Sequence, residues 1–363
     1  MVVMLFCLLG LAVNCVIIGP WALKGAYQGQ NDFRLFYIGG KLAGSENLYN
    51  VRQVLAAQQD AFGESSRRLM PVRLPFYYAF LSPLARFPYE QALVLWAVSS
   101  ILGIAFFILL SPPASRIWLA VACCWSLPLV FSVAIGQDLG FVLLVLGAAL
   151  RTYRAQKQWL AGVILSLCLI KFNLFLLLPL LFLGRREWRV ASGFCVGTAF
   201  LLTVSFASAG NWPHSYLALI LDPVVSPDPR LMPNLHGLAA RLPGHGFAEF
   251  LLSASVIVLV WRAVRKYDLE VGLGATLLGG LLLTRHAYMQ DCAILISTLV
   301  ILCLRPPNPV VRNCALALLV PFPYLLFFVQ GGVTAAILFL LLVVAMAWKG
   351  AKNGPSPVLE PNR

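Results

Sequence analysis

Charged residues are scarce in this chain. Only 11% of its 363 residues are charged, whereas soluble globular domains carry about 25%. With 60% hydrophobic residues as well, a soluble globule is excluded, and the chain is expected to be an integral membrane protein. Acids are fewest, 14 against 27 Lys and Arg, and the resulting formal charge of +13 is read as a sign of membrane topology and anionic-lipid contact. Nucleic acid is not an expected partner.

Motifs for nucleotides and metal ions are also missing. There is no Walker A sequence, and Gly272, Gly274 and Gly279 fall in an apolar run, where small residues serve close helix packing. The four histidines are scattered, and the nine cysteines lie in apolar runs without metal-ligand spacing. We therefore expect no cofactor and no metal ion.

Apolar runs are abundant. Runs near the length of about 20 residues that a spanning helix needs recur from Met1 to Trp348, and they do not alternate apolar and polar residues as barrel strands do. The first run, Met1–Leu23, lacks a basic start and is read as a span, not as a cleaved signal. The pattern predicts one all-α polytopic domain over residues 1–352, about 10–12 membrane segments with some short or re-entrant, and a cytoplasmic tail over 353–363.

Two runs do not fit a simple crossing. Leu139–Leu150 would span about 18 Å, which is too short for a hydrocarbon core of about 30 Å. Trp159–Leu183 is long enough but has Lys171 at its centre, where a lysine costs about 2.5–3.5 kcal/mol. We therefore predict that Trp159–Leu183 forms two short helices that turn near Lys171.

The positive-inside rule supports this split. With the N-terminus inside, the basic clusters all face the cytoplasm: Arg116, Arg151 to Lys157, Arg185 to Arg189, Arg262 to Lys266, Arg305 to Arg312, and Lys349 with Lys352. The long loops 24–88 and 210–246 then lie on the outer face. The prediction is a multi-pass protein of the cell (inner) membrane with both termini cytoplasmic and a polar site facing the periplasm or exterior.

Several polar residues gather at that outer face, each with a plain structural alternative. Asp32, in the polar stretch NDFRLFYIGGKLAGSENLYN, is either a helix N-cap or a functional carboxylate. Lys171 either binds an anion or reaches lipid headgroups. Gln137 and Asp138 either cap the following helix or contact a ligand.

The segment LLLTRHAYMQDCAILI leaves a similar choice. Arg285 and Asp291 either neutralise each other, or Arg285 and His286 bind phosphate while Asp291 fixes their geometry. Asn234 and His236 are loop residues that either hold the loop or contact a sugar. Tyr77 and Tyr78 are expected in an aromatic belt at the membrane interface.

These segments together resemble a known family. DFRLFYIGGKLAGSENLYN resembles the Asp-Phe-x3-Tyr/Trp signature after the first span of the polyprenyl-phosphate-mannose-dependent α-mannosyltransferases, also called domain of unknown function 2029 or glycosyltransferase family 87, of the glycosyltransferase-C superfamily. RLPFYYAFLSPLARFP, IGQDLGFVLLVLGAAL, LCLIKFNLFLLLPLLFLGRREWR and TRHAYMQDCAIL are similar to its later motifs. Three motifs differ from those of the family. This chain has Phe76-Tyr77-Tyr78 in place of Tyr-Pro-Pro, Lys171-Phe172 in place of Lys-Pro, and Thr284-Arg285-His286 in place of Thr-Pro-Tyr.

The resemblance implies transfer of a hexose, mannose by analogy, from a polyprenyl-phosphate donor to a hydroxyl of a lipid or glycan acceptor, with inversion. Asp32 would be the general base, and Lys171, Arg285 and His286 would bind the donor phosphate. Supporting or substrate-binding roles would fall to Gln137, Asp291, Asn234, Tyr37 and Tyr77. Two rival functions stay open: a transporter or flippase of a lipid-linked sugar, since broken helices and buried charge also describe carriers, and a non-catalytic assembly subunit.

Overall fold

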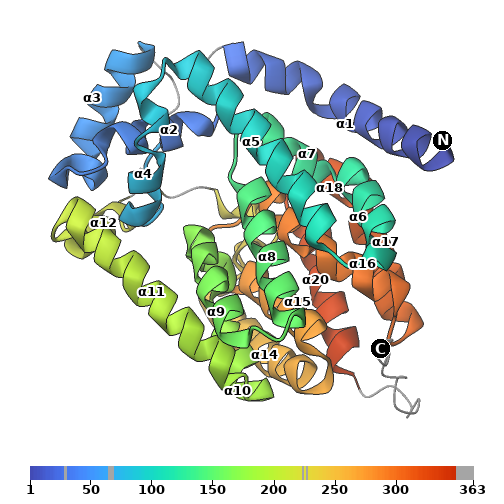
Figure 1. Cartoon of the computed structure of the whole chain (residues 1–363). Coiled ribbons are helices and arrows are strands. Elements are labelled where there is room, and N and C mark those ends of the chain that lie inside the picture. The colour runs from blue at the N-terminus through green and yellow to red at the C-terminus, as the bar shows by residue number, and fades with distance from the viewer. Residues whose placement is uncertain (28–30, 64–68, 223–224, 226–227, 349–363) are drawn as a thin grey trace.

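The chain is all-helical. The computed structural model describes residues 1–27, 31–63, 69–222, 225 and 228–348, and no strand occurs in them (Figure 1). The fold class is confirmed, whereas the expected tail 353–363 and the pair Lys349 and Lys352 lie outside the described residues.

Helices and short 3-10 turns (η) follow one another along the whole described chain. They are α1 Val2–Tyr27, α2 Phe33–Leu42, η1 Glu46–Tyr49, α3 Val51–Phe62, α4 Pro75–Leu81, η2 Leu84–Arg86, α5 Tyr89–Leu110, α6 Pro113–Trp125, α7 Leu127–Ala134, α8 Leu139–Arg154, α9 Gln158–Ser166, η3 Leu167–Phe175, α10 Leu178–Arg185, α11 Trp188–Ala209, α12 Trp212–Ile220, η5 Pro229–Leu231, α13 Leu235–Ala239, α14 His245–Lys266, α15 Leu269–Leu283, η6 Met289–Leu295, α16 Ile296–Leu304, α17 Pro309–Leu319, α18 Phe322–Leu325, α19 Phe327–Gln330 and α20 Val333–Ala347.

Several of these helices suit a membrane. Five of the described segments are long and apolar enough to cross one: Val2–Pro20, Tyr89–Leu110, Gln158–Phe175, Trp188–Ala209 and His245–Lys266. Up to 7 spans result if each of two bent pairs, α6 with α7 and α17 with the α18–α19 segment, is one span. Shorter apolar helices cover Leu269–Leu283, Met289–Leu304 and Val333–Ala347. The chain is therefore a multi-pass membrane protein.

The apolar segment around Lys171 is broken as predicted. Lys171 itself has non-helical angles, φ −120° and ψ 54°, between α9 and α10. The Tyr153 hydroxyl near the end of α8 donates to Glu187 Oε1, just after α10, at 2.8 Å. The ends of α8 and α10 therefore lie side by side. Because α9 begins directly after α8, the segment from α9 to α10 starts and ends at the same end of the molecule. The prediction of two short helices that turn near Lys171 is confirmed.

The length expected for the preceding helix is wrong. The helix α8 runs over 16 residues to Arg154, about 24 Å at 1.5 Å per residue, and does not end with its apolar run at Leu150. The charged last turn is accommodated because Arg154 Nε lies 2.5 Å from Glu270 Oε1.

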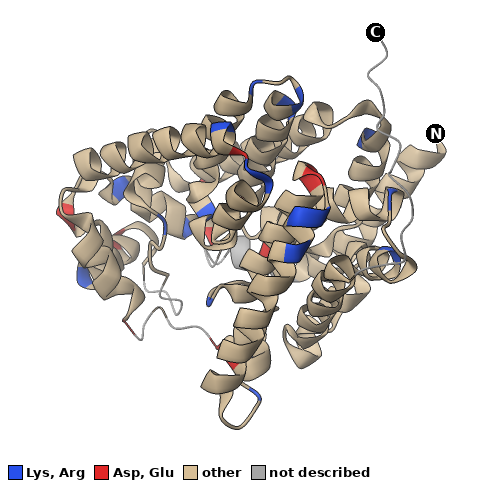
Figure 2. Cartoon of the chain, turned by 90° about the horizontal axis from the view of Figure 1, so that it is seen from below, with Lys and Arg blue, Asp and Glu red and all other residues tan. Residues whose placement is uncertain are grey.

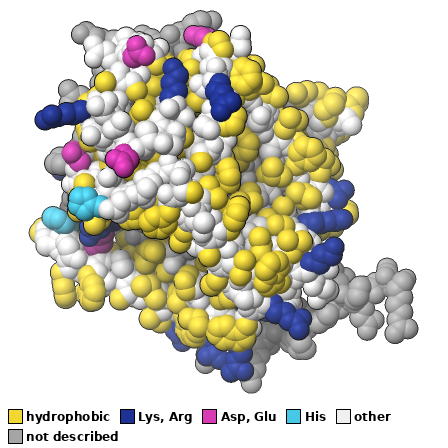
Figure 3. Space-filling view, turned by 60° about the vertical axis from the view of Figure 1, so that its left-hand side comes forward, with side chains coloured by type: hydrophobic (Ala, Val, Ile, Leu, Met, Phe, Trp, Pro, Cys, Tyr) yellow, Lys and Arg dark blue, Asp and Glu magenta, His cyan; other side chains and the backbone are white. Residues whose placement is uncertain are grey.

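Two ends of the molecule can be distinguished. At the basic end, Lys266 Nζ donates to the Trp348 carbonyl at 2.8 Å, near the Arg154–Glu270 pair. Figure 2 views the molecule from below and shows Lys and Arg on several helix ends and connections. At the opposite end, called the loop end, Arg241 Nη2 donates to the Gln330 carbonyl at 2.6 Å, so the loop after α12 meets the turn before α20. On the face in Figure 3, hydrophobic side chains form a broad area with Lys and Arg along its right-hand and lower edges.

The helices α2, α3 and α4 form a compact unit at the loop end, next to α12 (Figure 1). Its core is aromatic, and Tyr77 and Tyr78 are 4% and 0% exposed. The Tyr78 ring lies against Gly39, where any Cβ would overlap it. The expectation that these tyrosines form an interfacial belt is therefore wrong, because α2 covers them.

Candidate active site

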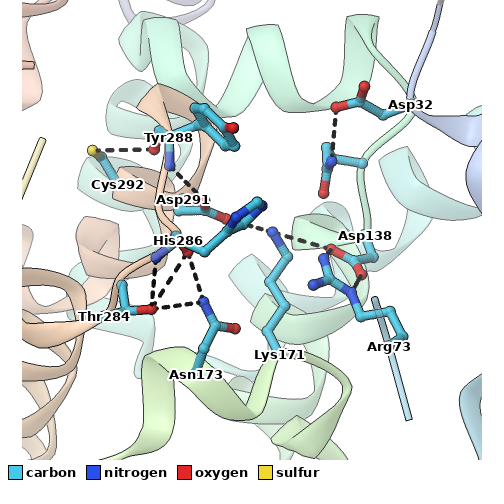
Figure 4. Close-up of polar contacts among 11 residues, drawn as sticks. Asp32, Arg73, Asp138, Lys171, Asn173, Thr284, His286, Tyr288, Asp291 and Cys292 are labelled. Atoms are coloured by element: carbon cyan, nitrogen blue, oxygen red, sulfur yellow. Dashed lines mark hydrogen bonds and ion pairs between the residues drawn. The ribbon is translucent and has the colours of Figure 1, made fainter. Parts of the chain in front are cut away.

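Asp32 occupies the N-cap position of α2, but its carboxylate does not cap that helix among the described residues. The neighbouring Asn31 does so instead, because its Oδ1 accepts a hydrogen bond from the Arg34 backbone N–H at 3.3 Å. The Asp32 carboxylate accepts at Oδ2 from Gln137 Nε2 at 2.8 Å. Asp32 is therefore directed toward the turn before α8 (Figure 4).

That turn, Ile135–Asp138, depends on a glycine. Gly136 has φ +74°, and a Cβ there would lie 2.7 Å from Phe33 Cβ. Its carbonyl accepts from Trp96 Nε1 at 2.9 Å, and the Ile135 carbonyl accepts from the Asp32 N–H at 2.8 Å. Only a residue without a Cβ fits this turn easily, so the sequence Ile-Gly-Gln-Asp fixes Gln137 beside Asp32.

Asp138 is fully buried and binds two cations. Arg73 donates to both of its oxygens, from Nε to Oδ2 at 2.9 Å and from Nη2 to Oδ1 at 3.2 Å. Lys171 Nζ lies 3.3 Å from Oδ1. The Asp138 side chain makes no capping hydrogen bond to α8 within the described chain, so the capping interpretation is wrong for Asp138. A buried carboxylate needs such partners, because an uncompensated charge in a low-dielectric interior is costly.

Lys171 continues the network to η6. Its ammonium lies 2.5 Å from Asp291 Oδ1, and the side chains are 3% and 7% exposed. Asp291 Oδ2 accepts from the Tyr288 backbone N–H at 2.8 Å, which fixes the start of η6. Of the two alternatives for this segment, the Arg285–Asp291 pair is therefore wrong: the Arg285 side chain is 82% exposed and lies 3.9 Å from Glu249.

The connection between α15 and η6 carries His286. Asn173 Nδ2 donates to the His286 carbonyl at 2.9 Å, and Asn234 Nδ2 donates to the Thr284 carbonyl at 2.7 Å. The His286 ring packs edge-on against Tyr288, with 5.1 Å between centroids. Burial lowers the pKa of His286, so the neutral imidazole is favoured at pH 7.

The structure brings most of the expected site residues into one region at the loop-end side of the broken helices. Asp32 contacts Gln137, Lys171 contacts Asp291, and His286 lies beside that pair (Figure 4). Asn234 is fully buried and acts as the N-cap of α13.

The two tyrosines lie in the aromatic core of the α2–α4 unit. Tyr37 is buried there and donates to the Phe87 carbonyl at 2.9 Å. Tyr77 packs edge-on against Phe36, with 5.6 Å between centroids. Their contact with substrate stays a prediction, as does that of the other site residues.

Three contributors were missed at the sequence level: Arg73, the ion-pairing role of Asp138, and Asn173. The signal for Asp138 was present, because an acid at the edge of an apolar helix requires a cation. Nothing in the local sequence identifies Arg73 as that cation, since 65 residues separate the two.

The charges of this network balance. Arg73 and Lys171 supply two cations, and Asp138 and Asp291 supply two carboxylates, all buried or nearly so. Half-buried Asp32 adds one more carboxyl group at the edge, through Gln137. No group of three or more His, Cys, Asp or Glu side chains in the described part of the chain is placed to hold a metal ion. Asp32 is thus a carboxyl group at the edge of a charge network that is neutral as a whole.

Fold and site together define a polytopic membrane protein with a buried polar centre. The sequence model of glycosyltransferase family 87 matches residues 75–298, more than half of the chain. The chain belongs to glycosyltransferase family 87 and is a membrane glycosyltransferase, which confirms the family resemblance. No curated protein and no solved structure matches it. The matched region includes Gln137, Lys171 and the 284–291 segment but neither Asp32 nor Arg73.

Proposed function

We propose that this glycosyltransferase transfers a hexose, mannose by analogy, from a polyprenyl-phosphate donor to a hydroxyl of a lipid or glycan acceptor at the outer face of the cell membrane. The observation that carries the proposal is the placement of Asp32. Its carboxylate is oriented by Gln137 at the edge of a buried charge network, in a chain of glycosyltransferase family 87.

The reaction follows from the groups present. Asp32 removes the proton of the acceptor hydroxyl, and the acceptor oxygen forms a bond to the anomeric carbon as the bond from that carbon to the phosphate oxygen breaks. The phosphate leaves with the electron pair and needs no general acid, so one carboxylate suffices where glycosidases use two. Attack opposite the leaving group inverts the anomeric configuration.

The donor phosphate needs positive charge or hydrogen-bond donors nearby. Arg285 is exposed and His286 lies on the same connection, so both suit direct contact with the phosphate. Lys171 is held between Asp138 and Asp291, which occupy two of its three N–H donors. The third donor suits a contact with the donor phosphate that keeps both ion pairs.

The test is transfer by the purified protein. Wild type and Asp32→Asn are compared with polyprenyl-phosphate-mannose as donor and membrane lipid extract as acceptor. We expect transfer by wild type and a loss of at least about 100-fold in the variant, the scale of a missing general base. Equal rates would remove Asp32 from the mechanism.

A carrier of lipid-linked sugars is the second candidate, supported by the broken segment at Lys171 and its buried charges. Absence of transfer with every sugar-phosphate lipid, together with movement of a labelled donor lipid across proteoliposome membranes, would favour it.

A further inference from the structure

Arg73 reaches the site from the segment that precedes α4. Its guanidinium binds both oxygens of Asp138, at 2.9 and 3.2 Å. The side chains are 11% and 0% exposed, so water does not compete freely for this pair. A bidentate arginine–carboxylate pair fixes direction as well as distance, and Arg73 therefore determines where the Asp138 carboxylate lies.

The backbone of Val72 and Arg73 is itself held by three tyrosine hydroxyls. Tyr49 donates to the Arg73 carbonyl at 2.7 Å, Tyr216 donates to the Val72 carbonyl at 3.2 Å, and the Arg73 N–H donates to the Tyr78 hydroxyl at 3.2 Å. Burial raises the pKa of Tyr216 to about 12 and raises those of Tyr49 and Tyr78 as well. These hydroxyls stay protonated at neutral pH and keep Arg73 in one position.

The turn on the other side of the pair contacts Asp32. Asp138 follows Gln137 directly, and Gln137 Nε2 donates to Asp32 Oδ2 at 2.8 Å. The Asp32 N–H donates to the Ile135 carbonyl at 2.8 Å, so the same turn holds both the backbone and the side chain of Asp32. A displacement of Asp138 moves this turn.

We infer that Arg73 is a positioning residue for Asp32: through Asp138 it fixes the turn Ile135–Asp138 and thereby directs the Gln137 amide at the Asp32 carboxylate. Arg73 lies just before the region that matches the family, so the match assigns it no role. The catalytic consequence rests on the proposed function, but the orientation of Asp32 does not.

The decisive variant is Arg73→Lys, because lysine keeps the positive charge but cannot form the bidentate pair with a carboxylate. A purely electrostatic role of Arg73 would survive this change. The matched control is Arg86→Lys, at an exposed arginine of η2, which packs against α2. Infrared pH titration of the purified protein, with the Asp32→Asn spectrum subtracted in each background, isolates the Asp32 carboxyl band.

We expect the titration midpoint of Asp32 to rise by at least about half a pH unit in Arg73→Lys, since a hydrogen bond to the charged form favours that form and would be weakened. In Arg86→Lys it stays as in wild type. On a Gln137→Met background, Arg73→Lys produces no further shift. An unchanged midpoint in Arg73→Lys, or the same shift with and without Gln137, overturns the inference.

Kinetics supply a second readout, because a positioning residue acts on the chemical step. Arg73→Lys is expected to lower kcat about 10-fold with polyprenyl-phosphate-mannose, with the donor KM changed less than about 2-fold, as for a displaced catalytic group. A KM effect alone contradicts the inference. If Arg73→Lys does not purify folded, Arg73→Gln replaces it. The shift of the Asp32 titration midpoint caused by Arg73→Gln is then measured with and without Gln137→Met, and a shift that persists in the Gln137→Met background overturns the inference. If wild type transfers from no sugar-phosphate lipid, the proposed function fails and the infrared titration still decides.

Discussion

The Lys171 ammonium lies 2.5 Å from Asp291 Oδ1, although 120 residues separate the two in the chain. The contact joins the break between α9 and α10 to the start of η6, two places where the apolar helices are interrupted. Each interruption supplies a charge that the other neutralises.

Removing Lys171 should therefore destabilise the protein strongly. In Lys171→Met, the buried Asp291 carboxylate loses its ammonium partner, and breaking a buried pair from one side costs about 3–5 kcal/mol. Chemical unfolding in detergent measures the loss, with exposed Lys157→Met as the control. Adding Asp291→Asn to Lys171→Met should recover part of the stability. A variant Lys171→Met as stable as wild type would contradict the importance of this pair.

The break at Lys171 could be predicted from sequence because a lysine inside a long apolar run is costly wherever the rest of the chain lies. Its partners could not. Periodicity describes one helix at a time, and neither Asp138 nor Asp291 is close to Lys171 in sequence. The cluster as a region was therefore predictable from topology, but the pairing within it was not.

The absence of the Arg285–Asp291 pair, one of the two alternatives for this segment, has a local cause. The two residues lie where one apolar segment gives way to the next. Between them, η6 begins at Tyr288 with a reciprocal capping box in which the Asp291 carboxylate accepts the Tyr288 N–H. That cap turns Asp291 inward to Lys171, while Arg285 stays on the exposed connection. The capping hydrogen bond therefore determines which cation Asp291 contacts.

Replacing glycines at the contact between α9 and α11 by larger residues should destabilise the protein. A Cβ at Gly193 would overlap the Trp159 carbonyl oxygen, because the two helices touch through their backbones there. Gly193→Val should cost about 1–3 kcal/mol or more, the usual scale of overpacking. The control is Gly246→Ala in α14, where nothing lies within 4 Å of an added Cβ. Thermal unfolding that ranks both variants equal would contradict close backbone packing.

The stability of the protein should fall below neutral pH partly through His286. Its pKa is lowered by burial, so between that value and the ordinary 6.5 the unfolded chain binds a proton that the folded chain does not. Stability then decreases as the pH falls through 6.5 and levels off below the folded pKa. Thermal unfolding of His286→Gln between pH 7.5 and about 5 should show a smaller decrease than wild type. The exposed His245→Gln should match wild type, and equal pH dependence of all three would contradict the assignment.

The proposed outer location of the site requires that the loop end faces away from the cytoplasm. Gln59 in α3 is exposed at the loop end of the molecule, and Lys157 before α9 is exposed at the basic end. A cysteine introduced at either position can therefore report on which side of the membrane that end lies. The nine native cysteines lie in apolar helices, and each variant is therefore compared with the unsubstituted chain. In intact expression cells, a membrane-impermeant maleimide should label Gln59→Cys and leave Lys157→Cys unlabelled until the cells are opened. This follows from the preference of Lys and Arg for the cytoplasmic side. The opposite labelling pattern would place Asp32 and its charge network on the cytoplasmic face, where the donor and acceptor proposed for it would have to be cytoplasmic too.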